Sequence, residues 1–354
     1  MSSPVYAIIL AGGNGERFWP LSDPERPKQF VDLFGGKTLI RHAVDRLAGF
    51  VPPERTIVIT NERLVRMTRS ALPMVPAANI YGEPCRRDTA AAVATACGLI
   101  KRLGGEDAVG CVLAADHLIE PADKFRRVLE DAVFAAEKTD AIVTLGIKPT
   151  SPATGYGYIE AGEKIAAKTK TAFNRVKRFV EKPDLKTAKK YLAKGNFRWN
   201  AGMFIWKATV LERAFREHAP DLAIMIDAVS AAKDLKRLLK REYSALRAIS
   251  FDYAVMEKAT NVVVAECPFD WDDVGSWTAV GRHFAADSDG NVIVGEATTV
   301  DTTDSIICGG GEHTVAVLGM KDVIVVHTPR ATLVCAKDKA PELKRLVRSL
   351  KFEV

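Results

Sequence analysis

The sequence lacks the features that would mark a membrane or exported protein. Its 354 residues contain no apolar run long enough to span a bilayer. The N-terminus has no basic start, and its first apolar stretch leads into a glycine-rich turn instead of a cleavage site. We therefore expect no signal peptide, no membrane span and a cytoplasmic location.

Closely spaced cysteines are also missing. The six cysteines lie at positions 85, 97, 111, 267, 308 and 335, and no two are closer than twelve residues. This spacing excludes a zinc knuckle and a Cys-x-x-Cys redox motif. Several cysteines lie in apolar stretches, which is typical of free, buried thiols in a reducing cytosol.

The chain has little excess of charge of one sign. Its net charge is +6, and basic residues are interspersed among acidic ones. A basic stripe for nucleic acid is therefore not expected, whereas small anionic substrates fit this balance. A hydrophobic content of 47% and a charged content of 27% are ordinary for a globular protein.

Short apolar runs alternate with helical patterns in the first half of the chain. Continuous apolar runs of this kind are expected when helices cover both faces of a parallel sheet. The pattern therefore predicts βαβ units in an α/β fold, with ligands at the carboxyl ends of the strands. The predicted strands are 6–10, 56–60, 108–114 and 141–145, and the predicted helices are about 38–48, 62–72, 88–103 and 122–138.

The pattern changes from about residue 150. Residues 155–160 and 176–182 read as antiparallel strands, and a helical stretch covers about 207–258. Residues 288–335 are rich in Val, Ile and Thr broken by Gly and Asp, which predicts a small β region with β-helix-like coils. An apolar stripe near the C-terminus predicts a capping or dimer-packing helix. We expect a catalytic domain over 1–283 and a β appendage with a terminal helix over 284–354.

The most informative segment follows the first strand. Three glycines let the backbone approach a ligand closely and turn N–H groups toward it, and two cations follow in the same segment. A strand, a glycine-rich loop and two cations together make a plausible triphosphate cradle. Its candidate residues are Leu10, Ala11, Gly12, Gly13, Gly15, Arg17 and Lys28.

This segment is neither of the common phosphate loops. A dinucleotide fingerprint requires a third glycine where the chain has Phe18, and no Gly-Lys-Ser/Thr follows as in a Walker loop. A nicotinamide dehydrogenase is therefore disfavoured. Taken alone, the glycines also fit a tight surface turn with stray charges.

Acidic residues occur where a metal could bind. Asp116 follows the predicted strand 108–114, and a second acid comes from Asp272 or Asp273 far downstream. Two carboxylates that converge would suit Mg²⁺, which prefers oxygen ligands and usually keeps substrate phosphates in its shell. The alternative is that these residues only cap helices or form turns.

A further carboxylate is a candidate for base recognition. Glu83 lies in Gly-Glu-Pro, shortly before Arg87 and Thr89, which are further candidates for nucleotide binding. Guanine presents adjacent N1–H and N2–H donors, and a carboxylate can accept both at once whereas an amide cannot. We hypothesise that Glu83 reads guanine, the alternative being an ordinary glutamate at a strand end.

Residues suited to a sugar phosphate lie between these blocks. Glu181 and Asn200 can bond sugar hydroxyls, Lys182 can bind the phosphate, and Gly157 would let the backbone approach the sugar. In one strand Glu181 and Lys182 would point to opposite faces, unless Pro183 ends the strand and Lys182 swings round. Each signal alone also fits an edge strand.

Together these blocks resemble the mannose-1-phosphate guanylyltransferases, within the sugar-nucleotide pyrophosphorylases. The resemblance implies a Rossmann-like, GT-A type nucleotidyltransferase with a mixed sheet, GTP and mannose 1-phosphate as substrates, and GDP-mannose and pyrophosphate as products. It also aligns Asp273 with the family's metal-binding acid, leaving Asp272 as the exposed neighbour. We further expect a homodimer. A cupin-type isomerase domain of some relatives is not expected. The matching blocks are residues 10–30, 82–92, 114–117, 154–160, 179–183, 199–202, 251–258 and 270–277.

The resemblance also gives each charged residue a role. Asp116 and Asp273 would hold Mg²⁺ or Mn²⁺, Arg17 would neutralise pyrophosphate, and Lys28 would act at the α-phosphate. Another hexose or heptose 1-phosphate with GTP is an alternative, as is a UTP- or dTTP-dependent pyrophosphorylase. A catalytically dead regulatory subunit is the remaining alternative, but such a subunit would have lost charged residues that are all present here.

Overall fold

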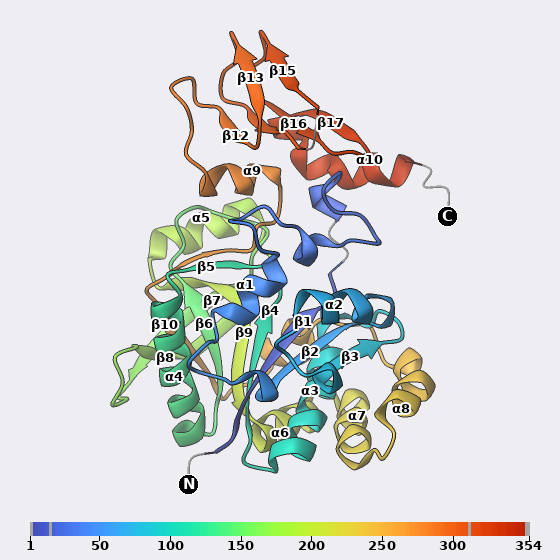
Figure 1. The fold of residues 1–354 in the computed structure, drawn as a ribbon. Helices are drawn as coiled ribbons and strands as arrows, with labels where there is room; N and C mark the ends of the chain where they lie inside the picture. The colour runs from blue at the N-terminus through green and yellow to red at the C-terminus, as the bar shows by residue number, and fades with distance from the viewer. Residues whose placement is uncertain (1–2, 14–15, 311–312, 351–354) are drawn as a thin grey trace. The chain divides into compact units, whose positions relative to one another are not determined.

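The computed structural model describes residues 3–13, 16–310 and 313–350. The chain forms two compact units (Figure 1). The sheet unit comprises Met1–Gly12, Arg41–Ala115 and Ile119–Trp271, and the coil unit comprises Gly13–Ile40, Asp116–Leu118 and Asp272–Val354. The predicted domain boundary between residues 283 and 284 stays a prediction. The coil unit combines three separate segments of the chain that pack together.

A mixed nine-stranded sheet forms the centre of the sheet unit. Its order is β3-β2-β1-β4-β9-β6-β10-β8-β7. Strands β1 to β4 pair in parallel, as does β6 with β10, whereas β9 runs antiparallel to β4 and β6. The strands are β1 Val5–Ala11, β2 Thr56–Asn61, β3 Ile80–Glu83, β4 Val109–Ala114, β6 Ile142–Ile147, β7 Tyr158–Ile165, β8 Phe173–Val180, β9 Phe197–Lys207 and β10 Val262–Cys267.

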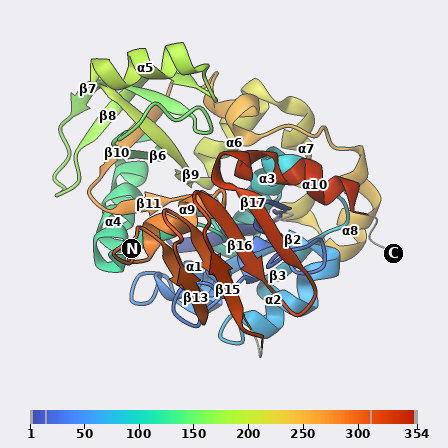
Figure 2. The same cartoon turned by 90° about the horizontal axis from the view of Figure 1, so that it is seen from above.

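Helices cover both faces of this sheet. Helix α4 packs on β4, β6, β9 and β10, whereas α3 and α6 pack against the sheet from the other side and α7 packs on them (Figure 2). Side chains alternate along β1, so that Ile8 joins the core beneath α3. The helices are α1 Leu39–Asp45, α2 Val65–Ala71, α3 Asp88–Gly104, α4 Ala122–Thr139, α5 Leu185–Lys194, α6 Ala208–His218, α7 Pro220–Ala231 and α8 Leu235–Glu242.

The coil unit is built from short β-strands in successive coils. Parallel pairing joins β12 to β14 and β14 to β16, while β17 closes the sheet antiparallel, and β13 pairs in parallel with β15. These elements are β12 Val292–Val294, β13 Ala297–Val300, β14 Ile306–Cys308, β15 Val315–Leu318, β16 Val323–His327 and β17 Thr332–Ala336, with helices α9 Trp277–Val280 and α10 Leu343–Ser349. Two further short strands, β5 Leu118–Glu120 and β11 Asp270–Asp272, pair with each other.

The β-coils also pack on the N-terminal loop segment of the same unit. One core joins Phe18, Leu118 and Trp277 to Ile306 and Ile324 of the coils and to Leu343 and Val347 of α10. Phe18 and Trp277 lie with their ring centroids 5.3 Å apart. The glycine-rich loop and the C-terminal coils therefore share one hydrophobic core.

Most of the expected elements are confirmed, with differences at particular points. The stretch 207–258 is helical but divided into α6, α7, α8 and short 3-10 and π-helical turns. On α10, Leu343 and Val347 are buried whereas Leu346 is exposed. All six cysteines are free, and three of them are buried. None of the helices in the described ranges is long and apolar enough to cross a membrane.

Candidate active site

Lys28 links the two acids that the sequence singles out. Its Nζ lies 2.9 Å from Asp116 Oδ2 and also donates to the main-chain carbonyl of Asp273. Lys28 belongs to the 3-10 helix η2 (Lys28–Phe30) and is buried, while Asp116 and Asp273 follow β4 and β11. Three residues far apart in the sequence therefore meet within the coil unit.

The charge on Asp116 is stabilised at this cluster. Burial alone would raise the pKa of the carboxyl, but the charges of Lys28 and His117 together with hydrogen bonds hold the pKa below its ordinary value. His117 lies near it as well, with Nε2 3.8 Å from Asp116 Oδ1. Asp116 is therefore an ionised oxygen donor at neutral pH.

These oxygen donors suit a hard cation such as Mg²⁺ better than a soft, thiolate-binding metal. Within the described ranges, no group of three or more His, Cys, Asp or Glu side chains could hold a metal ion alone. Mg²⁺ is usually held by one or two carboxylates together with substrate phosphates. The Asp116 carboxylate meets that requirement, with Asp273 as the predicted second ligand, and Mn²⁺ accepts the same oxygen donors.

The expectation that Asp272 is the exposed neighbour is wrong. Asp272 is only 6% exposed. Its carboxylate accepts hydrogen bonds from Arg282 at 2.6 Å and from the main-chain N–H of Val274, and it lies 3.0 Å from His283 Nε2. Although burial opposes the charge, His283 and Arg282 hold the pKa of Asp272 below its ordinary value. Asp272 thus anchors the turn that carries Asp273, with Val274 in a left-handed conformation.

The phosphate-loop candidates are partly described. Arg17 is exposed on the 3-10 helix η1 (Glu16–Phe18), next to the buried Phe18. Gly13 is exposed near the Gln29 amide. Gly15 lies outside the described residues. The roles of Arg17, Gly13 and Gly15 stay predictions.

At the end of β1, the main chain of Leu10 and Ala11 is tied into the sheet unit. The carbonyl of Leu10 accepts from Ala115 N at 3.1 Å, and that of Ala11 accepts from the Thr60 hydroxyl at 3.0 Å. Gly12 follows, and Glu83 Oε2 lies 3.4 Å from the point where a Cβ on Gly12 would stand. Gly12 therefore lies beside the Glu83 carboxylate, at the end of a strand that hydrogen bonds hold in place. The nucleotide contacts of Leu10, Ala11 and Gly12 stay predictions.

Glu83 has a partner that the sequence did not reveal. The hydroxyl of Tyr243 donates to Glu83 Oε1, and the Tyr243 side chain is completely buried. Burial raises the pKa of Glu83 to about 7, against the opposing effects of Tyr243 and Arg86. Tyr243 lies in a helical stretch where nothing in the pattern distinguished it from an ordinary core residue.

Arg87 and Thr89 contact the same downstream segment. Arg87 Nε donates to the carbonyl of Ser244 at 3.1 Å, and the Thr89 hydroxyl accepts from Phe251 N at 2.8 Å. Residues 87–89 thus hold segment 244–251 beside the start of α3. Their expected contacts with nucleotide stay predictions.

Glu181 and Lys182 meet in spite of their adjacent positions. Strand β8 ends at Val180, and Lys182 adopts a left-handed conformation with a φ of 45°. Its ammonium group pairs with Glu181 Oε1. A Cβ on Gly157 would lie 2.5 Å from Glu181 Oε2, so only glycine leaves room for the carboxylate there. The strand ends and Lys182 turns, which is the condition under which both side chains can serve one ligand.

Asn200 is held by three partners. Its Oδ1 accepts from Thr144 at 3.2 Å and from Gly202 N at 3.1 Å, and its Nδ2 donates to Asp252 Oδ1 at 2.9 Å. Gly202 has a φ of 66°, a left-handed turn that brings its N–H back to Asn200. One N–H of the amide remains for a ligand.

Asp252 is a second residue that the sequence analysis missed. It begins the π-helical turn η7 (Asp252–Met256), a rare element found frequently at functional sites. Burial, and then the nearby Glu181, raise the pKa of Asp252 to about 6. The block 251–258 had been noted without a role. A charged residue amid the apolar side chains of that block was the available signal.

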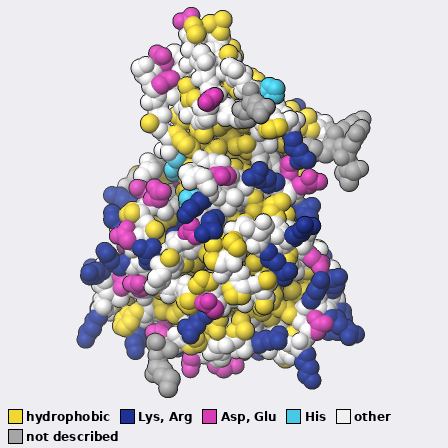
Figure 3. All heavy atoms as spheres, viewed as in Figure 1, with side chains coloured by type: hydrophobic (Ala, Val, Ile, Leu, Met, Phe, Trp, Pro, Cys, Tyr) yellow, Lys and Arg dark blue, Asp and Glu magenta, His cyan; other side chains and the backbone are white. Residues whose placement is uncertain are grey.

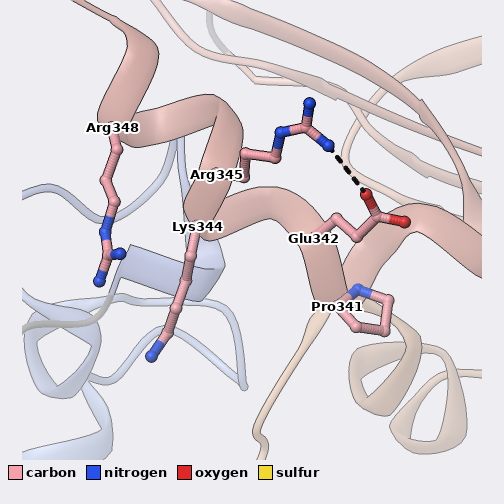
Figure 4. A pocket seen from close by; sticks show the side chains of 5 residues that line it. All are labelled: Pro341, Glu342, Lys344, Arg345 and Arg348. Carbon is pink, nitrogen blue, oxygen red and sulfur yellow. Dashed lines mark ion pairs between the residues drawn. The ribbon is translucent and has the colours of Figure 1, made fainter.

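A cavity of about 320 Å³ lies along α10 of the coil unit. Figure 4 shows Lys344 and Arg348 pointing the same way, whereas Arg345 turns toward Glu342, 3.9 Å away. Pro341 completes the lining, and none of the predicted site residues takes part. On the face seen in Figure 3, basic and acidic side chains are interspersed, without a continuous basic stripe.

Comparisons with known proteins agree with this arrangement. Residues 6–289 match the family model for nucleotidyl transferase, and residues 295–350 match that for the MannoseP isomerase/GMP-like beta-helix domain. The mannose-1-phosphate guanylyltransferase of Sinorhizobium fredii is 37% identical over 99% of this chain and 68% of its own length. That of Escherichia coli K12 is 36% identical over 99% of this chain and 74% of its own length.

A solved structure extends the agreement to the fold. The crystal structure named mannose-1-phosphate geranyltransferase from Thermus thermophilus has a TM-score of 0.87 and 36% identity, covering 97% of this chain and 98% of that one. The mixed α/β nucleotidyltransferase fold with a β-helix-like C-terminal region and a terminal helix is thereby confirmed. The chain belongs to the mannose-1-phosphate guanylyltransferase family of nucleotidyltransferases.

Proposed function

We propose that this enzyme transfers GMP from GTP to mannose 1-phosphate, giving GDP-mannose and pyrophosphate. The observation that carries the proposal is the cluster in which Lys28 contacts both Asp116 and Asp273. The Lys28 ammonium pairs with the Asp116 carboxylate and bonds the main-chain carbonyl of Asp273, and a buried cation at this place suits chemistry on polyanions, where charge must be neutralised. The names of the relatives support the same pair of substrates.

The proposed reaction needs no general base. The phosphate of mannose 1-phosphate is already an anion at neutral pH, and its oxygen attacks the α-phosphorus of GTP in line as pyrophosphate leaves. Catalysis is then positioning and charge neutralisation. Arg17 neutralises the leaving pyrophosphate, and Lys28 exchanges its contacts with the two aspartates for the α-phosphate.

Asp116 and Asp273 are the residues that would hold Mg²⁺ in this proposal. The bound ion would add positive charge at the phosphates. Asp272 keeps Asp273 in place through its bonds to Arg282 and Val274 N. We expect turnover to stop on addition of EDTA and to return with Mg²⁺ or Mn²⁺.

Base and sugar would be recognised by the sheet unit. Glu83 would accept the N1–H and N2–H of guanine. Glu181 and Asn200 would bond hydroxyls of the sugar and Lys182 its phosphate, with Asp252 holding the Asn200 amide. The ion pair between Glu181 and Lys182 supports a shared ligand for these two side chains.

A panel of substrates tests the proposal. Enzyme with Mg²⁺ is incubated with each nucleoside triphosphate and with mannose, glucose, galactose and heptose 1-phosphates, while pyrophosphate release is followed. We expect the highest kcat/KM for GTP with mannose 1-phosphate. A higher value for UTP or dTTP would overturn the choice of base, and a higher value for another sugar would support the alternative guanylyltransferase.

We also propose a homodimer in the cytoplasm. Leu346 is 42% exposed on α10, beside the buried Leu343 and Val347, and such an apolar side chain is available to a second copy. Six free cysteines suit a reducing compartment. Light scattering gives the mass in solution, and a monomer at micromolar concentration would contradict the dimer.

A further inference from the structure

Among the residues that the structure describes, the Glu83 carboxylate has one hydrogen-bond partner, the hydroxyl of Tyr243. Tyr243 begins the 3-10 helix η6 (Tyr243–Ala245), directly after α8, and its ring is fully buried in the main core of the sheet unit. Only the hydroxyl reaches out of that core, and it donates to Glu83 Oε1. A buried ring on a helical element has little freedom, so the hydroxyl is a fixed donor.

The two oxygens of Glu83 therefore have different surroundings. Oε1 accepts from Tyr243, whereas Oε2 faces Gly12 at the end of β1. A carboxylate has about four acceptor positions, so one bond from Tyr243 leaves both oxygens able to accept again. The last side-chain torsion of a glutamate normally has a broad distribution of angles. The bond restricts this torsion in Glu83 and so fixes the orientation of the carboxylate.

The segment that carries Tyr243 is itself held against the residues after Glu83. Arg87 binds the carbonyl of Ser244, Ala90 N donates to the carbonyl of Ile249 at 3.1 Å, and Thr89 binds Phe251 N. These three contacts connect the same two parts of the chain as the Glu83–Tyr243 bond. Segment 243–251 is thus a support for Glu83, built from a part of the chain 160 residues away.

We propose that Tyr243 sets the base selectivity of this enzyme by holding the Glu83 carboxylate in the one orientation that accepts two N–H groups from guanine. The proposal rests on GTP being the nucleotide substrate. Tyr243 is a positioning residue in this account, since it acts through Glu83 and does not touch the nucleotide.

The hydroxyl also affects the charge of Glu83. A hydrogen bond to the carboxylate favours its ionised form, so loss of the hydroxyl would raise the pKa of Glu83 further above about 7. A protonated Glu83 presents an O–H where guanine presents N–H donors, and the match is lost. Other charges near the pair are Arg86 and Arg87, with the thiol of Cys85, while Glu62 beneath β3 is paired with Lys236 and Lys240.

The experiment compares Tyr243→Phe with Tyr191→Phe, which removes a hydroxyl from another buried tyrosine, on α5. The values of kcat/KM are measured for GTP and for ITP, which lacks the 2-amino group, from pH 6 to pH 9. We expect Tyr243→Phe to lose about 10- to 100-fold with GTP at pH 7, the range for a bond to a charged group. The loss with ITP should be smaller, and activity with GTP should recover toward pH 9. Tyr191→Phe should change neither ratio nor pH profile.

A double-mutant cycle with Glu83→Gln completes the test. If Tyr243 acts through Glu83, adding Tyr243→Phe to Glu83→Gln should change the GTP-to-ITP ratio no further. Equal losses for both nucleotides at every pH, or a full additional loss in the Glu83→Gln background, would overturn the proposal. A wild-type enzyme that prefers UTP in the substrate panel would instead refute the choice of GTP, so that the two failures are distinguishable. Melting temperatures of all variants check that each is folded.

Discussion

The ammonium group of Lys28 lies 2.9 Å from the carboxylate of Asp116, although 88 residues separate the two in the sequence. The same ammonium holds the main-chain carbonyl of Asp273. Lys28 thus joins the Asp116 carboxylate to the main chain of the turn that carries Asp273.

Lys28→Met should lower kcat by about 100-fold or more, because removal of one preorganised charge at a reacting phosphate has this effect. The variant also leaves Asp116 without the ammonium that lowers its pKa, so that pKa should rise. Pyrophosphate release measures kcat. Lys37→Met, at an exposed position of the same segment, is the control and should retain full activity.

Gly157→Ala should raise the KM for mannose 1-phosphate about tenfold and leave the KM for GTP unchanged. The added methyl group would lie 2.5 Å from Glu181 Oε2, and the flexible carboxylate must move away. Folding stability should change little, because the side chain and not the backbone gives way. Gly155→Ala is a matched control, since a Cβ there meets nothing within 4 Å. Equal KM values in the two variants would contradict the sugar role of Glu181.

The raised pKa of Asp252 makes stability depend on pH. A buried carboxyl whose folded pKa is about 6, against an ordinary 3.8, binds more protons in the folded than in the unfolded state between these values. Its contribution to the free energy of unfolding therefore falls as pH rises from about 4 to about 6. Asp252→Asn should remove that fall. Melting curves at pH 4.5 and pH 7 check this, and parallel pH trends in wild type and variant would refute it.

Val347→Asp on α10 should lower both melting temperature and kcat. Val347 is 6% exposed and packs in the core that also contains Phe18, Leu118 and Val274. A charge buried there costs several kcal/mol. Arg348→Asp, at the exposed neighbour, should change neither quantity. If Val347→Asp lowered the melting temperature but left kcat unchanged at a temperature where the variant is folded, the expected effect of α10 on turnover would be contradicted.

Regular parts of the fold were predictable from the sequence. Strands such as β1, β2, β4 and β6 are continuous apolar runs, and periodicity alone identifies them. The helical stretch 207–258 was recognised without its breaks, although Pro220 at the start of α7 and Asp234 as the N-cap of α8 are local signals for two of them.

The site residues were predictable where a short sequence motif carries the chemistry. They were not predictable where contacts between distant segments determine which residue takes part. Asp272 and Asp273 are adjacent and chemically alike, so only the position of Arg282 and His283 reveals which one is buried. Tyr243 owes its role to one hydroxyl at the edge of a hydrophobic core. Such a contact depends on two distant segments, and nothing near Tyr243 in the sequence announces it.

The core that joins Phe18 to the C-terminal coils has a practical consequence. Arg17, Asp116 and Asp273 each lie within two residues of a member of that core, which also takes in β14, β16 and α10. The nucleotidyl transferase family model ends at residue 289, so the last seventy or so residues could be taken as dispensable. Their removal would expose the buried side of the loops that carry these three residues. Substitutions in the C-terminal coils can therefore lower activity as active-site substitutions do. A screen that judges a residue by its sequence distance from the site would misinterpret such variants.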